Sequence, residues 1–334
     1  MRVRKPWFRA SKNAWYVEID GKQIRLAVGA ENEQAALDAF YKRMAGVNDG
    51  SLLVVTLCDL FLDYSSSRHA ADSYKHYKHF LQDFCKKWPS LRVAEVKPFH
   101  VTRWLDARTH WTGAKRNAVI CIKRVFSWAE QEGLIAATPI KHVKKPAGGK
   151  RTRIVTAEEK KQILTAIRDQ AFRDFVFAMQ ETGCRPSEVS RVTAADCDLT
   201  LGIWRFEVHK TAAKTGRPRI VYLTPAMLEL TKRLLELHPA GALFRNTQGR
   251  AYSRNAIRCR FRRLRKKCPN LAGVVAYSYR HSFATGALVN GVGIAQVAEL
   301  LGHTSTDMVT RHYGHIADNI EYMRQAALRA TQQS

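Results

Sequence analysis

A chain of 334 residues is longer than the size at which a single hydrophobic core usually stops growing, so the sequence predicts two or three domains. Lysine and arginine number 55 against 29 acidic residues, and the formal net charge of +26 indicates a large polyanionic partner, with nucleic acid first. A membrane partner is disfavoured, because the sequence has no run of about 18 apolar residues. The basic opening MRVRKP lacks the apolar stretch of a secretory signal, and the seven cysteines form no CxxC pair, so we expect a cytoplasmic protein without a disulfide framework.

The first segment, residues 1–48, has the pattern of a β-hairpin followed by a helix. Apolar residues alternate from Trp15 to Ile19, a turn is expected at Asp20-Gly21, and the alternation resumes from Ile24 to Val28. A helix is expected from about Glu31 to Met44. The basic residues ahead of the hairpin make this segment either a DNA-binding arm or a solvated basic terminus.

The second segment, residues 52–140, has the periodicity of a helical domain. The clearest helix follows Gly113 and is expected to end near Gly133, and another is expected from about Asp72 to Trp88. The apolar side chains of the first of these fall at four- and three-residue steps and should form a core face: Ala114, Ala118, Cys121, Val125 and Trp128. The outward cations of the two helices are predicted DNA-binding residues: Lys75, Lys78, Lys115, Arg116, Lys123 and Arg124.

Residues 141–153 have the composition of a linker, with Pro146, Gly148-Gly149 and no acidic residue. Its cations complete the predicted DNA-binding set: Lys144, Lys145, Lys150, Arg151 and Arg153. A basic linker between two basic domains indicates a clamp that closes around a duplex, and a solvated hinge is the alternative.

The third segment runs from residue 154 to the C-terminus and combines helices with one hairpin. A capping box at Thr156 predicts a helix start. Trp204, Phe206 and Val208 alternate on one expected strand, and the second strand spans Ile220 to Leu223. Later helices are expected from Ile294 to Leu301 and from about Ile320 to Ala330.

Two short motifs in this segment place cations where they can meet a phosphate. In TGCRPSEV, Arg185 stands ahead of a proline that suits the first turn of a helix. The guanidinium group of Arg185 and the backbone amides of the helix can therefore point at an anion. An ion pair between Arg185 and Glu188 is the structural alternative. The turn of the hairpin carries Lys210 and Lys214, which can enter a DNA groove and protonate a leaving oxygen, or can serve solubility alone.

Two further motifs follow in order. YSYRHSFAT indicates a helix start that presents Arg280 and His281 together. In LLGHTSTDMVTRHYGH, a glycine-terminated helix presents His303, and a second short helix presents Tyr313 ten residues later. Zinc is disfavoured here, because no cysteine or carboxylate pair completes a ligand set around the histidines.

The four motifs in this order resemble the successive boxes of the tyrosine recombinase, or phage integrase, family. The resemblance covers residues from about 180 to 315, and the earlier segments are similar to the arm-binding and core-binding domains of many integrases. It implies a mainly α, multidomain clamp with small β elements. The implied domains are an arm-type DNA-binding domain at 1–48, a helical, SAM-like core-binding domain at 52–140, a basic linker at 141–153 and an α+β catalytic domain of the tyrosine recombinase type at 154–334.

The resemblance also implies a site-specific recombinase that works through a 3′-phosphotyrosyl intermediate. Arg185 and Arg280 would hold the non-bridging oxygens of the scissile phosphate and stabilise the transition state. Tyr313 would attack phosphorus and leave a free 5′-hydroxyl, and His303 would hydrogen-bond the phosphate or assist proton transfer. Glu188 takes the family's acidic position, where it would orient its neighbours.

Three positions stay open in this comparison. The family's histidine three residues before the second arginine is Tyr277 here, which can donate a hydrogen bond but cannot act as an imidazole base. The catalytic lysine is Lys210, favoured slightly by its place at the end of the first strand, or Lys214, whose spacing to the second strand fits shorter hairpins in the family. His281 is a supporting candidate beside Arg280.

The implied reaction needs neither ATP nor a metal ion nor another cofactor, because the phosphotyrosine stores the energy of the broken bond. The implied partner is double-stranded DNA, on which four protomers assemble at paired sites, with an accessory DNA-bending or directionality factor as a further candidate. The protein would accompany the nucleoid and serve integration or excision of a mobile element. The stretch from Ala326 to Ala330 would dock onto a neighbouring protomer or pack on its own domain.

Two other functions compete with this one. A type IB topoisomerase resembles the family in its catalytic centre, but the integrase-like N-terminal segments count against it. A DNA-binding architectural factor without catalysis would have no need of a tyrosine in the last motif.

Overall fold

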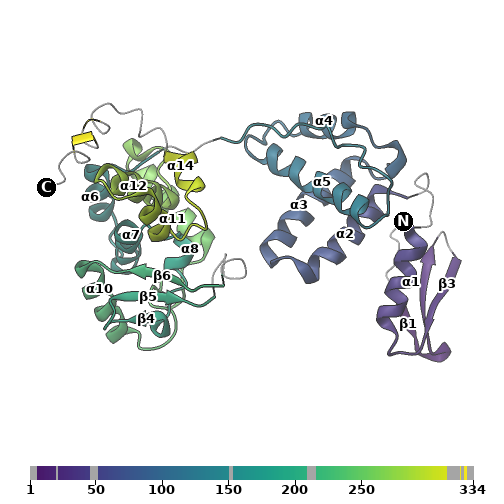
Figure 1. Ribbon diagram of the computed structural model, residues 1–334, viewed down its shortest axis with the longest axis horizontal. Helices are drawn as coiled ribbons and strands as arrows, with labels where there is room; N and C mark the ends of the chain where they lie inside the picture. Colours follow the sequence, from purple (N-terminus) through teal and green to yellow (C-terminus); the bar gives the residue numbers. More distant parts are fainter. Residues whose placement is uncertain are drawn as a thin grey trace. The chain divides into compact units, whose positions relative to one another are not determined.

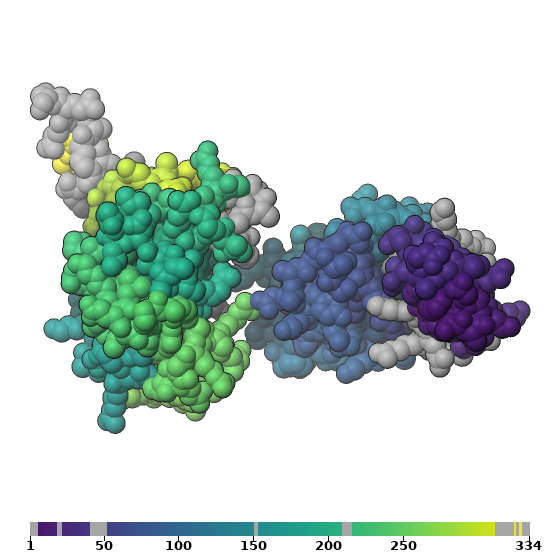
Figure 2. All heavy atoms as spheres, turned by 90° about the horizontal axis from the view of Figure 1, so that it is seen from below, coloured from purple at the N-terminus to yellow at the C-terminus, as the bar shows by residue number. Residues whose placement is uncertain are grey.

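The computed structural model describes residues 6–19, 22–45, 52–149, 153–208 and 216–313, together with Arg324, Ala327 and Leu328, and gives only the backbone at 41–45 and 311–313. The chain forms two compact units, Met1–Lys150 and Arg151–Ser334. They can be followed by colour in the space-filling view, from purple to blue in the first and from green to yellow in the second (Figure 2). None of the helices in the described ranges is long and apolar enough to cross a membrane.

The first unit begins with a three-stranded antiparallel sheet in the order β1-β2-β3 (Figure 1). The strands are β1 (Trp7–Arg9), β2 (Ala14–Ile19) and β3 (Lys22–Val28), and α1 (Glu33–Ala45) packs against the last two. The hairpin and the helix were predicted; β1 was not, because three residues are too few for an alternating pattern. A register shift between Trp15 and Tyr16 places Ala14 and Val17 on the buried face, so the expected alternation of Trp15 and Val17 on one face was wrong.

The rest of the first unit is helical, as predicted, and contains α2 (Val54–Arg68), α3 (Ala71–Lys87), α4 (Pro98–Asp106) and α5 (Ala114–Gln131). The sequence predicted α3 and α5 close to these bounds, whereas α2 and α4 were not located. Helix α5 buries the apolar stripe expected from its periodicity, including Cys121 and Val125. Aromatic side chains fill the space between the helices, with the rings of Phe84 and Trp104 in an edge-to-face pair 5.0 Å apart. This hydrophobic core also includes Val17 and Phe40 of the N-terminal part.

The second unit surrounds its own core with helices and one small sheet (Figure 1). Its first helices are α6 (Ala157–Ala166), α7 (Gln170–Thr182) and α8 (Pro186–Val189), and the predicted capping box starts α6, with the Glu159 amide 3.2 Å from the Thr156 hydroxyl. The sheet has the antiparallel order β4-β5-β6, formed by β4 (Cys197–Asp198), β5 (Ile203–Phe206) and β6 (Arg219–Tyr222). The predicted strand, which included Val208, was too long, because β5 ends at Phe206 and Val208 is exposed.

The described ranges of this unit also contain α10 (Pro225–Leu237), α11 (Arg254–Lys267), α12 (Ala276–Val289), α13 (Ile294–Leu301) and α14 (Asp307–Tyr313). Helix α12 contacts α7, α11, α13 and α14, so it lies at the centre of the unit. The predicted bounds of α13 are confirmed. The final helix expected from about Ile320 lies outside the described residues apart from Arg324, Ala327 and Leu328. The mainly helical fold with small sheets is the fold class predicted from the sequence.

Candidate active site

Arg185 and Glu188 are held together by the first turn of α8. Pro186 occupies the first helical position, and Arg185 precedes it in an extended conformation. Glu188, 4% exposed, accepts the Arg185 backbone N–H through Oε2 at 2.8 Å and the guanidinium Nη1 through Oε1 at 2.5 Å. The ion pair weighed as an alternative is therefore present, and it fixes the direction of the Arg185 fork.

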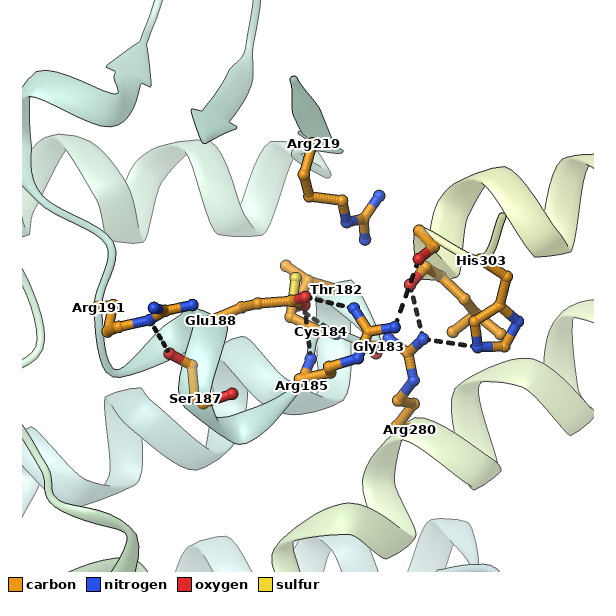
Figure 3. A network of polar contacts seen from close by, with 12 residues as sticks. Thr182, Gly183, Cys184, Arg185, Ser187, Glu188, Arg191, Arg219, Arg280 and His303 are labelled. Carbon is orange, nitrogen blue, oxygen red and sulfur yellow. Dashed lines mark hydrogen bonds and ion pairs between the residues drawn. The ribbon is translucent and has the colours of Figure 1, made fainter. Parts of the chain in front are cut away.

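Arg280 reaches the same place from the centre of α12, although it is 1% exposed. Its Nη1 donates to the carbonyl of Gly183 at 3.1 Å, and its Nη2 donates to the carbonyl of Leu301 at 2.6 Å. The same Nη2 lies 2.8 Å from Nε2 of His303 (Figure 3). The structure thus brings Arg185, Glu188, Arg280 and His303, which stand in three separate motifs, into one network.

The C-terminal end of α13 organises this network. The helix ends at Gly302 in the left-handed conformation, with φ of 64°, and the His303 amide donates to the carbonyl of Ala298 at 2.9 Å. The last carbonyls of a helix lack intrahelical donors and carry the negative end of its dipole, so they attract cations. Here three arginines donate to four successive carbonyls: Arg219 to Glu299 at 3.0 Å and Leu300 at 2.5 Å, Arg280 to Leu301, and Arg185 to Gly302 at 3.4 Å.

Positive charge exceeds negative charge in the network. The carboxylate of Glu188 pairs with Arg185 and also lies in the electric field of Arg219 and Arg280. Burial alone would raise the pKa of Glu188, but the Arg185 charge, the Arg185 backbone N–H and the Arg219 charge together hold this pKa below its ordinary value. Burial lowers the pKa of Arg280, and the neighbouring Arg185 lowers it further, yet a guanidinium stays protonated in proteins. A positively charged cluster of this kind can stabilise a phosphate and the extra negative charge of its transition state.

Gly183, at the end of α7, is required by both conformation and space. It has φ of 61°, and a Cβ there would lie 2.4 Å from the ring of Phe283. Gly202 has a similar φ of 63° with nothing within 4 Å of its Cβ position. We therefore expect Gly183→Ala to reduce the free energy of unfolding by about 1–3 kcal/mol more than Gly202→Ala does, measured by urea unfolding. Equal losses in the two variants would show that the ring of Phe283 moves freely away.

Two of the other predicted site residues, Tyr277 and His281, stand on α12 within one turn of Arg280, and Tyr277 interacts electrostatically with it. The rings of Tyr277 and His281 pack edge to face at 5.1 Å on α12, while Arg280 turns into the interior. The prediction that Arg280 and His281 are presented together was therefore wrong, because successive side chains of a helix point in different directions. Helix α14 brings the backbone to Tyr313, whose side chain is not described. Lys210 and Lys214 lie outside the described residues.

The predicted DNA-binding cations fall into four groups. Lys75, Lys78, Lys144 and Lys145 are exposed, Lys115 and Arg124 are half-buried, and Lys150 and Arg151 are not described. Three others contact the protein itself. Arg116 donates to the carbonyl of Pro146 at 2.9 Å, Lys123 donates to the carbonyl of Lys141 at 2.6 Å, and Arg153 forms an ion pair with Glu159. These three side chains hold the chain segments next to them.

Arg219 is the residue that the sequence reasoning missed. In the sequence it reads as the last cation of the basic stretch that joins the two strands, yet it is 4% exposed. The available signal was its position at the first residue of an alternating strand, where burial was possible. Nothing near it in the sequence points to α13, about 80 residues later, which supplies its partners.

Comparison with known proteins places the chain in a family. Residues 153–319 match the phage integrase family, and this match spans half of the chain. The protein therefore belongs to the phage integrase family of tyrosine recombinases, the enzymes that cleave and rejoin DNA strands at specific sites. The resemblance noted in the motifs is confirmed.

Among curated relatives, the chain is 24% identical over 282 residues to the tyrosine recombinase XerD of Ralstonia nicotianae, covering 78% of this chain and 88% of that protein. It is 26% identical over 249 residues to XerC of Mesorhizobium japonicum, covering 69% and 78%. Among solved structures, it matches the Tn1549 transposon integrase in complex with a circular intermediate DNA, with a TM-score of 0.68, 16% identity and coverage of 84% and 100%. It also matches a lambda integrase tetramer bound to a Holliday junction, with a TM-score of 0.65, 16% identity and coverage of 92% and 94%.

Proposed function

We propose that this recombinase uses Arg185 and Arg280 to hold the scissile phosphate and Tyr313 to attack it. The observation that carries the proposal is the convergence of the two guanidinium groups and His303 on the last turn of α13, from which α14 leads to Tyr313. Three buried or half-buried arginines around one carboxylate are expected to reduce the stability of the fold, because the desolvation of paired charges often outweighs their attraction. Folding stability therefore does not explain this arrangement. An anionic substrate supplies the missing negative charge.

The chemical step follows from these positions. A bond forms between the phenolic oxygen of Tyr313 and phosphorus as the bond from phosphorus to the 5′ oxygen breaks. The phenolic proton passes to a base, for which His303 is the candidate, and the 5′ oxygen takes a proton from Lys210 or Lys214. The 3′-phosphotyrosyl bond then retains the energy for rejoining, so the step uses no cofactor. Glu188 orients Arg185, and Tyr277 and His281 are supporting residues near Arg280.

The partner is double-stranded DNA, held in a clamp. The exposed lysines of α3 and of the segment before residue 150 supply cations in the first unit. In the second unit, α11 presents a row of exposed cations: Arg258, Arg262, Arg263, Lys266 and Lys267. Phosphate neutralisation by such residues provides the sequence-independent part of the affinity. Four protomers would assemble on two paired sites, with an accessory bending or directionality factor where one is used.

The proposed role is integration or excision of a mobile element rather than chromosomal resolution of the XerC and XerD type. The lambda integrase tetramer structure corresponds to 92% of this chain, whereas the structure of lambda integrase residues 75–356 corresponds to 77%. The N-terminal sheet and α1 precede the core-binding helices in this chain, and they support an arm-type DNA-binding domain there. The three-domain division is part of this proposal.

The test is a covalent trapping assay on nicked suicide substrates from the ends of the mobile element that encodes the protein. Wild type should give a denaturant-resistant adduct linked to the 3′ end, and Tyr313→Phe should give none, because the phenylalanine ring has no attacking oxygen. Tyr222→Phe is the matched control: Tyr222 is exposed on β6, and its variant should form the adduct at the wild-type rate.

Two outcomes would favour the competing functions. A wild-type protein that binds DNA tightly but forms no adduct on any end would be an architectural factor. An adduct that forms on unrelated duplexes and relaxes supercoils without strand exchange would indicate a type IB topoisomerase. An adduct that survives Tyr313→Phe would assign the nucleophile to another residue.

A further inference from the structure

Arg219 stands at the first residue of β6 and contacts the far end of α13. Its Nη1 donates to the carbonyls of Ile220 at 2.6 Å and Glu299 at 3.0 Å, and its Nη2 donates to the carbonyl of Leu300 at 2.5 Å. Figure 3 shows its guanidinium directed toward the network from the strand side. Arg219 therefore joins the small sheet to the helix end on which the phosphate-binding arginines converge.

The packing around Arg219 is close. A Cβ at Gly302 would lie 2.5 Å from its Nε, so the left-handed glycine leaves room for the guanidinium as well as ending the helix. The Nε itself is buried and has no hydrogen-bond partner among the described residues. A buried N–H without a partner costs about 1–3 kcal/mol, so stability alone does not explain an arginine here. Sites that break the rule that buried polar groups are hydrogen-bonded are often functional.

The contacts of the three arginines divide the end of α13 between them. Arg219 holds the carbonyls of Glu299 and Leu300, and the next two carbonyls are the anchors of Arg280 and Arg185. Arg219 is 4% exposed, and both of its terminal nitrogens donate to backbone carbonyls of β6 and α13. These contacts act on the position of its neighbours, Arg280 and Arg185, at the next two carbonyls.

We propose that Arg219 is a positioning residue for the recombination reaction: it fixes the last turn of α13 against β6, so that Arg185, Arg280 and His303 face the phosphate in one geometry. The proposal rests on the proposed function of this site. A misplacement of about 1 Å at a reacting centre can lower the rate by up to about 100-fold. Loss of the contact between Arg219 and α13 should therefore lower the rate of the cleavage step. DNA binding, which depends on many exposed cations, should change little.

The test compares single-turnover cleavage of two substrates by wild type and Arg219→Met. The first has an ordinary scissile phosphodiester; the second has a methylphosphonate there, in which a neutral methyl group replaces one non-bridging oxygen and so reduces the charge that the arginines must stabilise. Arg219→Met should cleave the phosphodiester about 10- to 100-fold more slowly than wild type. On the methylphosphonate, the cleavage rate of Arg219→Met should be within about threefold of the wild-type rate, because this substrate depends less on charge stabilisation by Arg185 and Arg280.

Two further variants separate this role from a general effect on folding. Gly302→Ala places a methyl group against the Arg219 guanidinium, so it should show the same difference between the two substrates. This variant replaces Arg219→Met in the test if Arg219→Met does not fold. Arg205→Met removes an exposed arginine from the same hairpin, 58% exposed and paired with Glu207 at 2.6 Å, and should cleave both substrates within about twofold of wild type.

The possible results distinguish the two proposals. Equal losses on both substrates, no loss on the phosphodiester, or the same loss in Arg205→Met would overturn the positioning role of Arg219 while leaving the recombinase mechanism intact. Failure of wild type to form any tyrosine-linked adduct would instead overturn the proposed function, and this is measured in the same experiment before the variants are compared.

Discussion

Replacing Arg280 with lysine is expected to slow strand cleavage by about 100- to 1,000-fold, the range found when one preorganised donor to a developing oxyanion is removed. Arg280 uses two different nitrogens of one rigid fork to meet the carbonyls of Gly183 and Leu301 and the ring of His303. An ammonium group keeps the charge but presents it at a single point, so it cannot hold these partners together. The measurement is the single-turnover rate of covalent adduct formation at saturating protein.

The matched control for Arg280→Lys is Arg233→Lys. Arg233 lies on α10, is 45% exposed and pairs with the buried Asp174 at 2.9 Å, so the change keeps an ion pair that lies on a different helix from the network. It should cleave at close to the wild-type rate, and both variants should bind DNA with nearly unchanged affinity. If Arg280→Lys cleaves within tenfold of wild type, a point charge is sufficient and the fork has no special role.

Local periodicity predicted much of the fold. The stripe on α5 and the bounds of α13 could be read from sequence, because each helix buries one face and ends at a glycine or close to one. The strand β1 and the bulge in β2 could not, since three residues carry no period and one extra residue reverses the inward face without changing the composition. The fold class was correct, whereas the expected alternation at Trp15 and at Val208 was wrong.

The candidate site was predictable where its residues stand in recognisable motifs. Arg185, Arg280 and His303 were named from the sequence, and the structure brings them together at the end of α13. Arg219 was not predictable, because its role depends on contacts with a helix distant in sequence, and a buried arginine looks like a solvated one in a basic stretch. For the same reason Arg116 was read as a DNA contact, although it donates to a carbonyl of its own chain.

Replacing Glu188 with alanine should have the largest effect on stability. Glu188 is the carboxylate partner of Arg185 and also lies within the field of Arg219, so its removal leaves buried positive charge uncompensated. Breaking a buried ion pair by removing one partner typically costs about 3–5 kcal/mol. Hydrogen exchange of the α7 and α12 segments measures this loss of unfolding free energy in the second unit alone. The control Glu229→Ala removes the carboxylate of an exposed pair with Lys232 and should cost less than about 1 kcal/mol.

The effect of Glu188 should also depend on pH in a definite direction. Its pKa in the folded protein lies below the unfolded value of about 4.3, so the folded state favours the ionised form. This contribution to the free energy of unfolding is fully present above the unfolded pKa and is lost as the pH falls through the folded pKa. The stability difference between wild type and Glu188→Ala should therefore be constant near neutral pH and should shrink in acid. A difference that stays constant down to the acid limit of folding would mean that the carboxylate acts through packing rather than through its charge.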